Sequence, residues 1–100
     1  MADNADNVIL EHVKRSLTIL DDFSDAVLLQ KIAEAKEFLA AQGVSDTQIK
    51  SALGTAAITI FVSDTWTVGG EVKYSDALMF NVSRLYSNSL VEAKGGGNAT

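Results

Sequence analysis

Apolar residues recur every three or four positions along most of this chain, which is the spacing of helices with one buried side. The first such segment predicts a helix over residues 8–17, with Asn7 as its N-cap. Its buried stripe would consist of Ile9, Val13 and Leu17. The polar residues before it are expected to form a flexible N-terminal arm over residues 1–7.

A connector rich in turn-forming residues follows over residues 18–24 and interrupts the periodicity. The acidic pair Asp21 and Asp22 is explained by the start of the next helix, whose dipole stabilises negative charge. We expect three apolar side chains of the connector to hold it against the core. These are Ile19, Leu20 and Phe23.

The clearest element is a second helix, predicted over residues 25–42. Gly43 follows it directly, as is typical of a residue that ends a helix with a left-handed backbone. The apolar stripe of this helix recurs at helical spacing. It consists of Leu28, Leu29, Ile32, Ala35, Phe38 and Leu39.

A third helix is predicted to begin just after Ser45, because Ser45 and Gln48 have the spacing of a capping box. Its stretch 56–62 is apolar on nearly all sides, which indicates burial on more than one side. In so small a domain the simplest second cover is another subunit, so Ile58 and Val62 are predicted interface residues. A strand is the alternative interpretation of this stretch, since it is rich in β-branched residues.

A fourth helix is predicted over residues 76–91, with Ser75 as its cap. Its apolar residues are Leu78, Met79, Val82, Leu85 and Tyr86. Glycine is frequent in the following segment, so residues 92–100 are expected to form a flexible tail. The predicted fold is all-α: one domain over residues 8–91 containing a small bundle of about four helices.

Residues 65–74 differ in character and leave two possibilities open. In the first, Gly69-Gly70-Glu71 is the loop of a projecting β-hairpin. One side of that hairpin would be apolar and would face a partner or a second subunit. It would consist of Trp66, Val68, Val72 and Tyr74. In the second, the third helix runs on to Trp66 and a loop follows.

Composition narrows the range of functions. The chain has 100 residues, 13 of them acidic and 8 basic, for a net charge of −5, and it contains no cysteine. Nonspecific nucleic-acid binding needs clustered Lys and Arg, which are missing here. No apolar run approaches the length of a membrane span, and the polar start does not look like an export signal, so no membrane association is expected.

Candidate catalytic chemistry is sparse. His12 is the only histidine and has neither a second histidine nor a cysteine to form a metal or nucleophile site. A calcium loop starting at Asp21 would need a glutamate where Ile32 stands. Neither glycine cluster is followed by the Lys-Ser/Thr of a phosphate-binding loop. We therefore expect a protein that is not an enzyme, with no catalytic, cofactor-binding or metal-binding residues.

Five segments together follow the pattern of a known family. They are residues 10–17 (LEHVKRSL), 21–29 (DDFSDAVLL), 33–39 (AEAKEFL), 49–53 (IKSAL) and 80–85 (FNVSRL). With these segments and the order of predicted helices around an acidic turn, residues 8–86 resemble the small head-tail connector proteins of tailed bacteriophages. These proteins form the family of DNA-packaging and head-completion adaptors.

The resemblance implies a structural protein of the virion that forms a ring of about twelve copies under the portal protein. Such a ring would extend the DNA channel, let DNA pass without sequence-specific binding, and dock the stopper or tail-completion protein. The protein would reside in the host cytoplasm before assembly and at the head-tail interface afterwards. The alternative is a small acidic regulatory module that binds a single host or phage protein.

Overall fold

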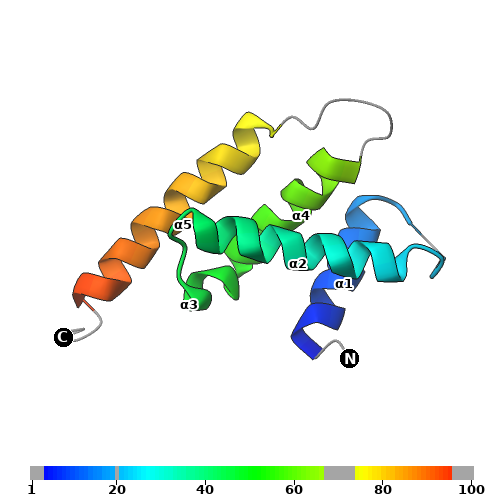
Figure 1. Cartoon of the computed structure of the whole chain (residues 1–100), viewed down its shortest axis with the longest axis horizontal. Coiled ribbons are helices and arrows are strands. Elements are labelled where there is room, and N and C mark those ends of the chain that lie inside the picture. The colour runs from blue at the N-terminus through cyan, green and yellow to red at the C-terminus, as the bar shows by residue number, and fades with distance from the viewer. Residues whose placement is uncertain (1–3, 20, 67–73, 96–100) are drawn as a thin grey trace.

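The computed structural model describes residues 4–19, 21–66 and 74–95, and all regular structure in them is helical. The helices are α1 (Asn4–Ser16), α2 (Asp25–Ala41), α3 (Asp46–Ile49), α4 (Ala52–Trp66) and α5 (Asp76–Gly95). They form a flattened bundle with principal extents of 47 × 30 × 18 Å (Figure 1). The predicted all-α fold and small helical bundle are confirmed.

Helix α4 lies at the centre of the bundle and contacts α1, α2, α3 and α5. Its buried residues are Gly54, Ala57, Ile58, Thr59, Phe61 and Val62. The stretch 56–62 is therefore a helix, and the alternative of a strand is wrong. Because four helices of the same chain cover α4, its nearly uniform apolarity needs no second subunit.

Helix α1 begins at Asn4, earlier than predicted, so Asn7 lies inside the helix and is not its cap. Residues 1–3 of the expected arm lie outside the described residues. The helix ends in a Schellman motif in which Ile19 N donates to Lys14 O and Thr18 N to Arg15 O, at 2.8 and 3.1 Å. Thr18 takes the left-handed position of this motif, with φ of 58°.

The end of α2 has the same architecture and confirms the predicted role of Gly43. Val44 N donates to Leu39 O and Gly43 N donates to Ala40 O, at 3.1 and 3.0 Å. Gly43 has φ of +90°, and a Cβ atom at this position would lie 2.8 Å from Tyr86 Cε1. Glycine is thus required both by the turn and by the close approach of α5.

The predicted third helix is divided into α3 and α4 at Lys50 and Ser51. The Ser51 hydroxyl donates to Gln48 O at 2.6 Å and accepts from Gly54 N at 3.1 Å, so it both ends α3 and caps α4. A Cβ atom on Gly54 would overlap the carbonyl oxygens of Gln48 and Ile49. The sharp junction between the two helices therefore depends on a glycine at position 54.

Ser75 caps α5 as predicted, since its hydroxyl accepts from Leu78 N at 3.2 Å. Ser75 N in turn donates to Asp64 Oδ2 of α4 at 2.8 Å, so the two helices are joined at this end. Helix α5 continues to Gly95, beyond its predicted end, and residues 96–100 of the expected tail lie outside the described residues.

Helix α4 includes Thr65 and Trp66, so the hairpin prediction is wrong for these two residues. Trp66 packs against the core from this last turn of α4, and the Thr65 hydroxyl donates to Phe61 O at 3.0 Å. The rest of the predicted hairpin, residues 67–73, lies outside the described residues.

Candidate interaction surface

The six predicted interface residues lie in different environments. Ile58 and Val62 are fully buried within the single chain and offer no surface to a partner in this fold. Their assignment to an interface is wrong, because the neighbouring helices already cover both sides of α4. Trp66 is partly buried against the core, and Val68 and Val72 lie outside the described residues.

Tyr74 is the predicted interface residue that the structure leaves substantially exposed, at 42%. Its ring packs on Phe61 and Phe38, with centroid distances of 5.7 and 5.1 Å. Phe38 and Phe61 also contact one another at 5.3 Å. Tyr74 therefore covers the edge of the core with one face and leaves the remainder of its ring accessible.

Most of the exposed large apolar side chains in the described part of the chain lie on α5. One side of this helix is buried through Leu78, Val82, Leu85 and Ser89. The rest of its circumference presents Met79, Phe80, Tyr86, Leu90 and Val91, which we call the α5 face. The sequence pattern placed Met79 and Tyr86 in the buried stripe, but they lie at its edge and are 44% and 43% exposed.

Arg84 borders the α5 face. Its guanidinium carbon lies 5.9 Å from the ring centroid of Phe80, a distance at which a cation is attracted to the aromatic ring. No carboxylate in the described part of the chain pairs with Arg84. This edge of the face is therefore both aromatic and positively charged.

A second exposed apolar group is the ring of Phe23 in the turn between α1 and α2. It is 95% exposed, so the prediction that Phe23 holds the connector against the core is wrong. The reason is local: Asp21 Oδ1 accepts a hydrogen bond from Phe23 N at 3.0 Å, and the turn directs the side chain outwards. Ile19 does pack against the core as predicted, and Leu20 lies outside the described residues.

Lys14 fastens this turn to α1. Its Nζ atom lies 2.7 Å from Asp22 Oδ1 and 2.9 Å from Asp25 Oδ1, and its side chain is only 7% exposed. The hydrogen bond to Asp22, followed by the one to Asp25, raises the pKa of Lys14 above its ordinary value of 10.5, although burial acts in the opposite direction. Lys14 therefore stays charged and holds the acidic turn in place.

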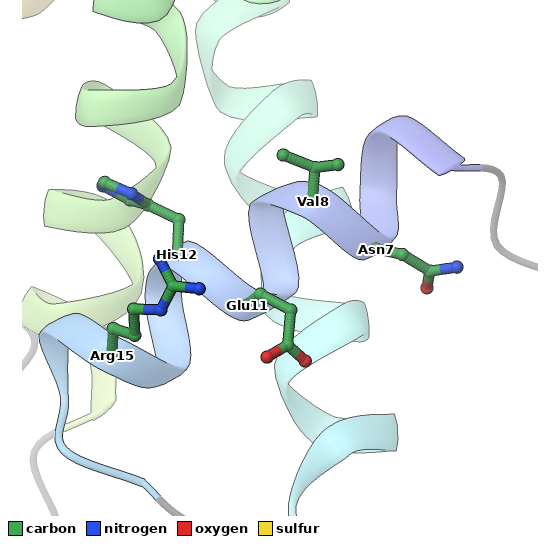
Figure 2. Close-up of a pocket in the computed structure, with 5 residues that line it drawn as sticks. All are labelled: Asn7, Val8, Glu11, His12 and Arg15. Carbon is green, nitrogen blue, oxygen red and sulfur yellow. The ribbon is translucent and has the colours of Figure 1, made fainter.

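The outer surface of α1 has a hollow of about 350 Å³ lined by Asn7, Val8, Glu11, His12 and Arg15. All five side chains come from one helix, and the Glu11 carboxylate and the His12 imidazole point away from one another (Figure 2). His12 is exposed. The described residues bring no buried polar group and no second element to this hollow, so it gives no reason to assign acid-base chemistry to His12.

A polar network that the sequence did not predict joins α3 to α5. Glu92 accepts from the Ser45 hydroxyl through Oε1 and from Gln48 Nε2 through Oε2, both at 2.8 Å. The Ser45 hydroxyl accepts from Gln48 N at 3.3 Å, as a capping box requires, but Gln48 reaches Glu92 instead of returning to Ser45 N. Ser45 N donates to the Ser89 hydroxyl at 2.8 Å. This network fixes the start of α3 on α5.

Within the described residues, no group of three or more His, Cys, Asp and Glu side chains is arranged to hold a metal ion. None of the helices in this part of the chain is long and apolar enough to cross a membrane. No protein-family model matches the chain, and neither a curated protein nor a solved structure is significantly similar to it.

Proposed function

We propose that this protein is a structural, non-enzymatic virion component of a tailed bacteriophage: a head-tail connector that assembles as a ring under the portal protein. The ring extends the DNA channel and docks the stopper or tail-completion protein. The resemblance of residues 8–86 to the connector family motivates the proposal. The structural observation that carries it is the presence of two unlike exposed apolar groups in opposite halves of the molecule.

The α1–α2 turn with Phe23 lies at one end of the long axis, and α5 runs through the other half (Figure 1). Single exposed apolar residues are common on protein surfaces, but five on one helix face, bordered by a cation, are typical of a contact site. Two different surfaces on one chain suit a head-to-tail contact, which closes into a ring when the rotation per subunit permits.

The energetics favour a contact made on assembly over a permanent one. Burying a fully exposed phenylalanine contributes about 1.5–3 kcal/mol, which is too little to hold two free proteins together. A ring on a portal gains this energy at every subunit junction while the platform aligns the subunits. The net charge of −5 also suits a DNA channel, because an acidic wall does not retain phosphates.

The proposal is tested by measuring the mass and shape of the particles that this protein forms alone and with portal rings. We expect sedimentation and native mass spectrometry to show a monomer or weak oligomer for the protein alone. With the portal protein of the same phage added, we expect a ring of about twelve copies, visible by electron microscopy.

Two other outcomes would contradict the connector. A defined one-to-one complex with a single host or phage protein, and no ring on the portal, would identify the regulatory module instead. An unchanged monomer with every neighbouring gene product would leave the two apolar groups without an assembly role.

A further inference from the structure

We infer that neighbouring copies in the ring join through one specific contact: Phe23 of one copy packs on the α5 face of the next, and Asp21 and Asp22 lie beside Arg84. The inference rests on the proposed ring and names the surfaces that form its junction. The occupant of the α5 face is thus a second copy of this chain.

The Phe23 turn is ordered before any contact forms. Asp21 holds Phe23 N, Asp25 N donates to Asp22 O at 3.2 Å, and Lys14 binds the carboxylates of Asp22 and Asp25. An exposed ring on a fixed backbone loses little conformational freedom when it is buried by a partner. These are the properties of an aromatic anchor in a protein-protein interface.

The α5 face offers an apolar surface for such an anchor. At 3.6 residues per turn, Met79, Tyr86 and Leu90 lie along one flank of it, and Phe80 and Val91 lie along the other. The exposed short side chains of Ser83 and Ser87 lie between these two groups on the same side of the helix. An aromatic ring resting on the two serines would therefore contact larger apolar side chains on both sides.

The charges beside Phe23 and the α5 face favour a head-to-tail contact between two copies over a symmetric contact between two Phe23 turns. The Asp22 side chain is 88% exposed and Asp21 is exposed, whereas Arg84 has no carboxylate partner in the described residues. Packing the α5 face on the Phe23 turn brings these opposite charges together. Packing two Phe23 turns on one another would bring four carboxylates together, which is unfavourable.

Cross-linking between two single-cysteine variants tests the contact, because the chain contains no cysteine of its own. Ala26→Cys places a thiol on an exposed site next to the Phe23 turn, and Ser83→Cys places one in the middle of the α5 face. Each variant is treated with a short bismaleimide alone and in an equimolar mixture, in the presence of portal rings. Mass spectrometry of the linked peptides identifies the joined positions.

We expect efficient linkage between positions 26 and 83 in the mixture and little linkage in either variant alone. Equally efficient linkage within Ala26→Cys alone or within Ser83→Cys alone would overturn the inference in favour of a symmetric contact. Rings that form without any 26–83 link would overturn the inference while leaving the connector proposal intact. A 26–83 link in open chains that never close would support the contact and contradict the ring.

Charge reversal supplies an independent measurement. Arg84→Glu should raise the protein concentration needed for assembly on portal rings about tenfold or more, and Arg84→Lys should leave it nearly unchanged. Arg15→Glu makes the same change in net charge on exposed α1 and is the matched control. Equal increases for Arg84→Glu and Arg15→Glu would show that only net charge matters and would overturn the assignment of Arg84 to the contact.

Discussion

Thr18 and Gly43 occupy the same position in two Schellman motifs, and both have a left-handed backbone. Glycine adopts this conformation freely, whereas a β-branched threonine is strained by it. Thr18 is exposed, so its side chain offers no packing energy in compensation. The end of α1 therefore stores strain that the end of α2 avoids.

Replacing the strained residue should stabilise the protein. We expect Thr18→Gly to raise the free energy of unfolding by about 1 kcal/mol, because removal of the left-handed penalty exceeds the entropic cost of glycine. Chemical denaturation followed by circular dichroism measures the change. The converse variant, Gly43→Ala, should lose about 1–2 kcal/mol. A loss of stability in Thr18→Gly would show that the threonine is not strained.

At the scale of elements, the buried Lys14 side chain connects α1 to the start of α2 through its ion pairs with Asp22 and Asp25. The buried Oδ1 atom of Asp25 lies 2.9 Å from the Lys14 ammonium group and has no other polar partner among the described residues, so its carboxylate depends on this ion pair. Glu11 lies three residues before Lys14 on the same helix, yet Lys14 forms its ion pairs with the two aspartates that the connector turn brings to it.

The raised pKa of Lys14 leads to a prediction about pH. A basic group whose pKa is higher in the folded state contributes stability that is complete below its ordinary pKa of 10.5 and is lost as pH rises above it. Lys14→Met should melt at a lower temperature than the wild type near neutral pH. The difference between the two melting temperatures should shrink as the pH rises above 10.5. A difference that stays constant over that range would rule out the ion pair as its source.

At the junction between α3 and α4, we predict that replacing a glycine by alanine lowers the free energy of unfolding, which is the opposite of the usual effect. Glycine to alanine inside a helix normally stabilises by about 1 kcal/mol. At Gly54 the added methyl group would overlap the carbonyl oxygens of α3, so we expect Gly54→Ala to lose about 1–3 kcal/mol. Denaturant titration gives the value. A gain in stability would mean that α3 can move away from α4 at no cost.

At the scale of the whole molecule, folding and assembly use different residues. The core is closed by the helices of one chain, and the exposed apolar groups on α5 and in the α1–α2 turn contribute little to it. Substitutions in these groups can therefore separate the stability of the subunit from its association with other proteins.

Phe23→Ser is the clearest example of this separation. Because Phe23 is 95% exposed, the free energy of unfolding should change by less than about 0.5 kcal/mol, while ring formation on the portal should be strongly reduced. Thermal melting and electron microscopy measure the two effects. Val8→Ser removes another exposed apolar side chain, on α1, and is the matched control. Normal rings from Phe23→Ser would remove Phe23 from the interface.

Several features of the fold followed directly from the sequence, because they depend on neighbouring residues along the chain. The long α2 follows from its apolar periodicity, Gly43 from the left-handed turn that ends it, and the starts of α3 and α5 from the hydroxyls of Ser45 and Ser75. Each of these features is stabilised within four or five residues, and that range is visible in a sequence.

Other features were decided only by the tertiary structure, because they depend on residues far apart in the chain. The sequence showed that the helix carrying Ile58 and Val62 must be buried on more than one side. It could not show that other helices of the same chain bury both residues. Phe23 looked like a core residue until the turn directed it outwards. An apolar residue indicates that surface should be buried, but the three-dimensional arrangement determines whether its own chain or another protein buries it.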